Sequence, residues 1–298
     1  MPKISVVLPT YNGERFIRKS IESVISQTET DWELIIVNDC STDATLDICR
    51  EYEAVDARIK VISNEVNRKL PASLNVGFRA AAGEHLTWTS DDNMYKPDAL
   101  RVMSDFLASN KAYDLVCCEY DIVNESGVKI REFRHINGRE KEYYLLSECN
   151  VGACFMYTRP LFERVGDYNE NFFCAEDYEY WMRIALSGRI KYLKGNHYTY
   201  VSNEYSLTAT KQNVVIAKTK EIRSKYLPIF VKHFSISNKE MAHIYYMMWR
   251  YDSDNVDLIW SAANLDRRYL YRAGAHRFKM FRRKVKNAIK KSARAVFQ

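Results

Sequence analysis

Strand and helix signals alternate through the first 120 residues, and this alternation constrains the fold more than any other feature. Strands are predicted at residues 4–8, 34–37, 59–62, 84–88 and 115–118, and the first of them is an apolar run typical of a strand buried on both faces. Between these strands, apolar residues at helical spacing predict helices over residues 16–25, 70–82 and 97–109. A further helix is predicted after the polar turn at residues 38–43, running to about residue 53. Repeated strand–helix units predict a mostly parallel sheet with helices on both faces.

The pattern changes after residue 120. The later elements are predicted as a hairpin over 120–134 around Ser126-Gly127, strands over 151–157 and 198–201, and a helix over 175–186. From about residue 213 the spacing is helical throughout. We therefore expect one domain over residues 1–212 and a helical region over residues 213–298.

Composition excludes several classes of protein. Ten glycines in 298 residues, with no GxGxxG or P-loop motif, argue against a glycine-built phosphate cradle. Seven cysteines without a CxxC spacing indicate neither a disulfide framework nor a zinc site, and reduced thiols fit a cytoplasmic protein. No apolar run is long enough to span a bilayer, and the first residues read as a strand rather than a signal peptide.

Charge is divided unevenly along the chain. Residues 267–298 carry twelve Lys or Arg and no Asp or Glu, which leaves the rest of the chain at a net charge of −6. Apolar residues recur at helical spacing within this tail, so residues 275–298 predict a basic amphipathic helix of the kind that lies on an anionic membrane surface. A helix that docks its apolar face on the body is the alternative. No nucleic-acid-binding module accompanies the charge, so we expect no nucleic acid partner.

Asp91 and Asp92 follow directly after the predicted strand 84–88. Adjacent carboxylates raise each other's pKa, and a divalent cation removes that cost. Mg²⁺ and Mn²⁺ typically take one or two protein carboxylates and complete their coordination with phosphate oxygens and water. The pair therefore predicts a metal–diphosphate site. The alternative is an acidic turn that caps the helix starting near Pro97.

Two other polar clusters end predicted strands, at residues 9–12 and at Asn38-Asp39. Ligands of open α/β sheets bind outside the carboxyl ends of the strands. Because all three clusters fall at such ends, they favour a shared binding edge over three unrelated turns.

Four blocks of the sequence resemble family 2 inverting glycosyltransferases. They occur in the order and near the spacings typical of that family. The first two are Ser5-Val6-Val7-Leu8-Pro9-Thr10-Tyr11-Asn12 and the stretch 33–43, which ends in Ser41-Thr42-Asp43. The other two are the stretch 83–98, which contains Thr89-Ser90-Asp91-Asp92-Asn93, and Gly152-Ala153-Cys154 together with the stretch 176–183. The resemblance covers roughly residues 3–210. It implies a GT-A fold with a Rossmann-like half, a nucleotide-sugar half at 1–120 and an acceptor half at 121–212.

The resemblance also implies roles on the donor side. Asp92 would bind the metal, with Asp91 near the ribose or the metal shell. Pro9 and Tyr11 would bind the nucleotide, with Tyr11 stacking on the base while Asp39 reads its edge. Lys69, with its neighbour Arg68, would help the cation neutralise the diphosphate. For Tyr11 the alternative is packing at the strand end, and for Lys69 and Arg68 a solvated loop.

On the acceptor side, Asp177 matches the family's general base, with Glu176 and Trp181 contacting the acceptor. A helix N-terminus stabilises an anion, so we expect a lowered pKa for Asp177. The alternatives are that the two acids only complement the helix dipole and that Trp181 belongs to the core. His197 is expected to be structural rather than a metal ligand.

Two positions depart from the family pattern. Thr89 stands where an Asp is common, which leaves the number of carboxylates on the metal open, and Asn38 stands where the turn usually begins with Asp. The predicted function is metal-dependent transfer of a sugar, expected from UDP, to a glycan or lipid-linked acceptor, by a protein on the inner face of the plasma membrane. The alternatives are a non-catalytic sugar-nucleotide or glycan-binding module, a glycoside hydrolase and a nucleotidyltransferase.

Overall fold

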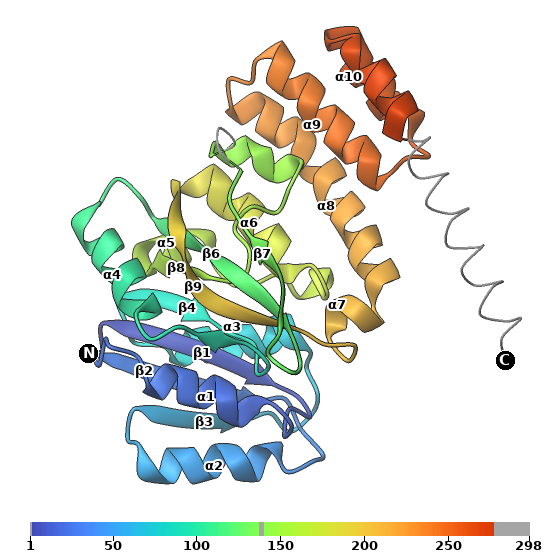
Figure 1. The fold of residues 1–298 in the computed structure, drawn as a ribbon. Helices are drawn as coiled ribbons and strands as arrows, with labels where there is room; N and C mark the ends of the chain where they lie inside the picture. Colours follow the sequence, from blue (N-terminus) through green and yellow to red (C-terminus); the bar gives the residue numbers. More distant parts are fainter. Residues whose placement is uncertain (1, 137–139, 277–298) are drawn as a thin grey trace, which may run out of the picture. The chain divides into compact units, whose positions relative to one another are not determined.

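The computed structural model describes residues 2–136 and 140–276 (Figure 1). The chain divides into two compact units, one formed by residues 1–145 and 149–222 and the other by residues 146–148 and 223–298. The basic helix predicted over residues 275–298 falls almost entirely on 277–298, which lie outside the described residues.

The first unit is built on a nine-stranded sheet with the order β3-β2-β1-β4-β8-β6-β9-β5, in which β7 pairs with β6. Its strands are β1 (Ile4–Thr10), β2 (Trp32–Asn38), β3 (Ile59–Ser63), β4 (His85–Trp88), β5 (Met94–Tyr95), β6 (Leu115–Asn124), β7 (Lys129–Phe133), β8 (Phe155–Thr158) and β9 (Ile190–Ser202). The helices that connect and follow them are α1 (Ile17–Ile25), α2 (Thr45–Val55), α3 (Leu70–Ala80), α4 (Ala99–Ser109), α5 (Arg159–Val165), α6 (Glu176–Ser187) and α7 (Leu207–Thr210), with short 3₁₀ turns at Glu142–Leu146 and Glu170–Phe172.

The predicted parallel strands are confirmed. β3, β2, β1 and β4 pair in parallel, and every residue of β1 is buried, as its continuous apolar run requires. Side chains of β1 and β2 pack with α1, α2 and α4 into one core, which includes Ile4, Ile21, Leu34, Ile48 and Leu100. The carboxyl edge of this half of the sheet carries the three polar clusters.

The second half of the sheet is mixed. β8 lies antiparallel between β4 and β6, β9 runs parallel to β6, and the predicted hairpin is confirmed as β6 and β7, with Tyr120 opposite Phe133. β6 and β9 are longer than predicted because their polar residues pair with each other across bulges. β5 was not predicted, and it pairs with β9 just after Asp91 and Asp92.

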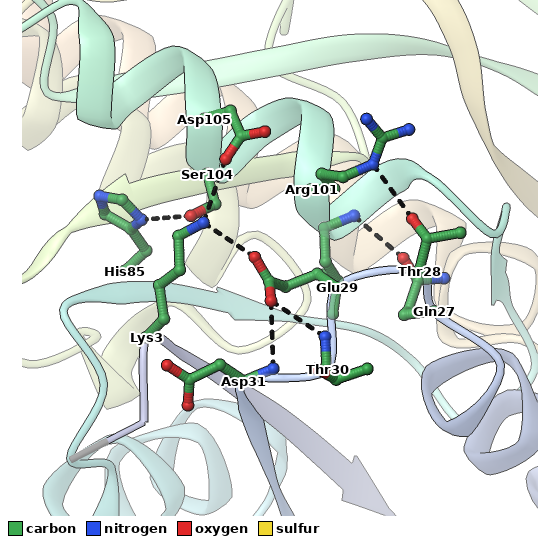
Figure 2. Close-up of polar contacts among 11 residues, drawn as sticks. Lys3, Gln27, Thr28, Glu29, Thr30, Asp31, His85, Arg101, Ser104 and Asp105 are labelled. Atoms are coloured by element: carbon green, nitrogen blue, oxygen red, sulfur yellow. Dashed lines mark hydrogen bonds and ion pairs between the residues drawn. The ribbon is translucent and has the colours of Figure 1, made fainter.

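Polar contacts connect side chains at the amino ends of the parallel strands, which form the edge opposite the three polar clusters (Figure 2). Lys3 Nζ lies 2.8 Å from a Glu29 oxygen and 3.0 Å from an Asp105 oxygen, and the His85 ring hydrogen-bonds to Ser104 at 2.9 Å. His85 is buried, and burial lowers its pKa. These contacts join β1 and β4 to α4, so this edge has a structural role.

The second unit contains α9 (Asn238–Tyr251) and α10 (Val256–Leu265), while α8 (Gln212–His233) begins in the first unit and ends in the second. Its core comprises Ala242, Trp249, Ile259, Ala262, Tyr269 and Ala273. A capping box starts α9, in which Ser237 and Glu240 satisfy each other's backbone N–H groups. Within the described residues, no helix has the length and apolar character needed to cross a membrane.

Candidate active site

The carboxyl ends of β1, β2 and β4 bring the predicted donor-side acids together. Asp39 N–H donates to the Thr10 carbonyl at 2.9 Å, and the Thr10 hydroxyl donates to Asp91 Oδ2 at 2.6 Å. Gly13 completes the contact, because a Cβ at this position would collide with the Asp91 carboxylate. The turn after β1 is therefore shaped around Asp91.

Asp91 and Asp92 are both partly buried. Burial, reinforced for Asp91 by the charge of Asp92, raises the pKa of Asp91 to about 7. Burial raises the pKa of Asp92 to about 6. Two carboxylates held at this energetic cost are the arrangement that a divalent cation would relieve.

The oxygens of Asp92 are in different environments. Oδ2 accepts a hydrogen bond from Asn203 Nδ2 at 2.7 Å, whereas Oδ1 is buried with no hydrogen-bond partner among the described residues. A buried carboxylate oxygen without a donor fits a metal ligand. In the described part of the chain no three His, Cys, Asp or Glu side chains form a metal-binding group, so a cation here would take most of its ligands from phosphate and water.

Asp39 shapes the loop before α3. Its Oδ1 accepts from Asn64 Nδ2 and from the backbone N–H of Arg68, and its Oδ2 accepts from the backbone N–H of Lys69, each at 2.8 Å. Lys69 has a φ of 74°, a strained value for a residue with a side chain, and it begins α3. Asp39 therefore holds the backbone of Arg68 and Lys69 just before α3, and both of their side chains are exposed.

Tyr11 and Pro9 lie at the end of β1. Pro9 is buried in the sheet, so its contribution is to hold the strand end, while Tyr11 is 50% exposed. A half-exposed tyrosine at the end of a strand leaves part of its ring accessible for a base to stack on.

The acceptor-side acids stand at the first turn of α6. Asp177 Oδ1 accepts from the N–H of Tyr178 at 2.6 Å, and Glu176 is buried with Oε2 lacking a hydrogen-bond partner among the described residues. Burial raises the pKa of both, and the charge of Asp177 adds to the shift at Glu176. The expected lowering of the Asp177 pKa is wrong, because the cost of desolvation exceeds the favourable field of the helix terminus.

The pKa of Tyr200 is affected by acids from both groups. This β9 side chain has a pKa raised by burial and, after burial, by the charges of Asp92 and Asp177. Both carboxylates therefore lie close enough to the Tyr200 hydroxyl group for their charges to affect its pKa.

Trp181 belongs to the core. Its side chain is fully buried, and its ring packs edge-on against Phe155 with centroids 4.6 Å apart. The prediction that Trp181 contacts the acceptor is therefore corrected in favour of the packing alternative, because a ring without exposed surface cannot stack on a sugar. Aromatic partners from β8 and α6 enclose it, and those contacts depend on tertiary structure.

The remaining sequence candidates have structural contacts. The His197 ring pairs with Asp98 at 3.1 Å, at the start of α4, which supports a structural histidine. The Thr89 hydroxyl hydrogen-bonds to the Tyr198 hydroxyl at 2.6 Å, so the position that holds an acid in much of the resembled family joins β4 to β9 here.

Two residues that contact the acids were not singled out from the sequence. Thr10 lies in the first of the four blocks that resemble the family, so the sequence held a signal that could have identified it. Asn203 lies 111 residues after Asp92, and no local pattern connects the two.

The sheet, which is parallel over β3, β2, β1 and β4 and acidic at its carboxyl edge, has the architecture of a GT-A fold. The model for glycosyl transferase family 2 matches residues 5–166, more than half of the chain, and the chain belongs to that family. A Haemophilus influenzae protein described as an uncharacterized glycosyltransferase is 27% identical over 277 residues, covering 83% of this chain and 86% of that protein.

Solved structures share the fold. S. aureus TarS in complex with UDP-GlcNAc matches with a TM-score of 0.61 at 20% identity, over 93% of this chain and 92% of that one. The mannosyltransferase PcManGT from Pyrobaculum calidifontis, in complex with GDP-Man and Mn²⁺, matches with a TM-score of 0.59 at 16% identity, over 92% and 75%. The predicted fold class and the prediction of a glycosyltransferase are confirmed.

Proposed function

We propose that this glycosyltransferase inverts the anomeric centre of a UDP-sugar as it transfers the sugar to a hydroxyl group of a glycan or lipid-linked acceptor. The observation that carries the proposal is the buried Oδ1 of Asp92, which no hydrogen-bond donor in the described residues satisfies, at the edge where Asp39 and Asp91 also converge. A similar fold has been solved with GDP-Man and Mn²⁺ bound.

Asp92 would hold a Mg²⁺ or Mn²⁺ ion, with Asp91 beside it or on the ribose. A bound cation supplies Lewis-acid stabilisation of the charge that develops on the leaving diphosphate. The exposed side chains of Lys69 and Arg68 would add positive charge to help neutralise the diphosphate. Tyr11 and Asp39 would bind the base, and the contacts of Asp39 with the 64–69 loop make base binding and loop position interdependent.

Asp177 would accept the proton of the acceptor hydroxyl. Its raised pKa makes it a stronger base than an exposed aspartate, since basicity rises with pKa while the group remains ionised. Glu176 beside it resists ionisation, so the pair would carry mainly one negative charge, and we assign that charge to Asp177.

The acceptor is proposed to lie at a membrane. The basic run over residues 267–298 is the reason, because lipid-linked saccharides are presented at anionic surfaces and clustered Lys and Arg are attracted to them. We propose a cytoplasmic protein that associates peripherally with the inner face of the plasma membrane and contributes to cell-surface glycan synthesis.

Release of UDP tests the function. The protein is mixed with Mn²⁺, a membrane-extracted acceptor fraction and a panel of UDP-sugars that also includes GDP-mannose. The proposal predicts acceptor-dependent UDP release from one donor and none in EDTA. Binding of a donor without any release under these conditions would instead indicate a non-catalytic sugar-nucleotide module. Release of GDP alone would correct the nucleotide.

A further inference from the structure

The amide of Asn203 stands against Asp92 at the end of β9. Asn203 is 8% exposed, and its Nδ2 donates to Asp92 Oδ2 at 2.7 Å. This contact leaves Oδ1 as the Asp92 oxygen without a donor. One oxygen of the proposed metal ligand is thus engaged by protein and the other is open.

The backbone fixes which way this amide points. Asn203 Oδ1 accepts the N–H of Tyr205 at 3.0 Å, so the oxygen end faces its own loop and the NH₂ end must face Asp92. An NH₂ group has no lone pair to offer a cation. Asn203 therefore acts on a bound metal through Asp92 and is not itself a ligand.

The segment that carries Asn203 is anchored on both sides. Val201 N–H donates to Asn93 Oδ1 at 2.8 Å, directly beside Asp92 in sequence. The Ser206 hydroxyl donates to the Asn203 carbonyl at 3.1 Å and begins α7. The hydrogen bond between Val201 and Asn93 therefore holds the Asn203 amide in place relative to Asp92, independently of the contact that the amide itself makes.

The orientation of Asp92 matters because the described residues closest to it in sequence are engaged in contacts of their own. The Asp91 carboxylate is turned toward Thr10, with Oδ2 accepting from its hydroxyl, and Thr89 supplies a neutral hydroxyl already bonded to Tyr198. When a metal has few protein ligands, its affinity depends on the orientation of each ligand, and hydrogen bonds from surrounding residues fix that orientation.

We propose that Asn203 is a positioning residue that aims Asp92 Oδ1 at the divalent cation. This inference rests on the proposed function, since it requires that Asp92 binds the cation. It predicts that loss of the amide weakens cation binding while the fold and the cation-independent part of UDP binding are kept.

The test measures Mn²⁺ affinity by electron paramagnetic resonance of free Mn²⁺ at saturating UDP, using the full chain. Asn203→Leu and the smaller Asn203→Ala both remove the donor, and the second variant guards against overpacking. Asn264→Leu, on the exposed face of α10, is the matched control. Thermal unfolding in EDTA shows whether each variant is folded.

We expect both Asn203 variants to bind Mn²⁺ about 10- to 100-fold more weakly than wild type, with Asn264→Leu unchanged. Folded Asn203 variants with Mn²⁺ affinity within twofold of wild type would overturn the inference and leave the proposed function intact. UDP binding by the wild-type protein without any Mn²⁺ binding would overturn the cation in the proposed function and this inference with it.

Discussion

Asp177 is the residue on which the chemical step depends in this account. Asp177→Asn removes the proton acceptor but keeps size and the contact with the Tyr178 N–H, so turnover should fall by at least ~10²-fold while donor affinity is unchanged. Asp47→Asn is the matched control, since Asp47 is an exposed acid in the first turn of α2. Steady-state turnover and donor titration measure both. Equal small losses in the two variants would mean that Asp177 only complements a helix dipole.

Asp91 should make the metal-free fold less stable at neutral pH. Its folded-state pKa of about 7 lies above the value of 3.8 for an unperturbed Asp, so folding is favoured when it is protonated and that stability is lost as pH rises toward 7. Asp91→Asn should therefore raise the free energy of unfolding in EDTA by a few kcal/mol at pH 8 and by less at pH 5. Urea unfolding at the two pH values measures it.

A gain in stability for Asp91→Asn that is the same at pH 5 and pH 8 would contradict a raised pKa for Asp91. Addition of Mn²⁺ and UDP provides a second comparison. The wild-type protein should gain more stability from them than the variant does, because ligands that bind only the folded state stabilise it by mass action.

At the residue scale, sequence reasoning located the acids but not their partners. Asp39, Asp91, Asp92 and Asp177 stand in blocks that a reader can match by position. Asn203 was not found, because its contact with Asp92 is made by the pairing of β9 with β6 and β5, far along the chain. The pKa of Asp177 was predicted in the wrong direction, because the depth of burial is a property of the folded structure.

At the scale of elements, buried strands and amphipathic helices were predictable because their periodicity is strong. β5 was not predictable, since two residues show no periodicity. α5 was not predicted either, because it begins with Arg159-Pro160 directly after β8, without a separating loop. β9 was expected over four residues and extends over Ile190–Ser202, because its polar residues are satisfied by pairing with β6. The added residues lie almost entirely at the amino end of the strand, and β9 still ends one residue before Asn203.

The junction of β4 with α4 should make stability sensitive to acid. Burial lowers the folded-state pKa of His85 below 6.5, so the unfolded chain binds a proton more readily and stability is lost as pH falls through about 6.5. His85→Gln should reduce the loss of stability between pH 7.5 and pH 5.5, measured by urea unfolding. His233→Gln, at an exposed position, is the control. A pH dependence unchanged by His85→Gln would contradict this role.

At the scale of the whole molecule, the acidic body and basic tail predict a charge-dependent association with membranes. The full chain should sediment with phosphatidylglycerol vesicles at low salt and lose this binding at high salt, because exposed charges are screened. A chain ending at His276 keeps Ala273 and the other core residues of the second unit, and it should not bind. Equal binding by both chains would remove the membrane from the proposal.

The central claim is that Asp92 holds the cation that bridges protein and diphosphate. Anomalous diffraction from crystals grown with Mn²⁺ and a UDP-sugar tests it most directly. We predict a manganese peak within about 2.5 Å of Asp92 Oδ1, with diphosphate oxygens completing the coordination. A bound UDP-sugar whose diphosphate has no ion beside Asp92 would contradict it.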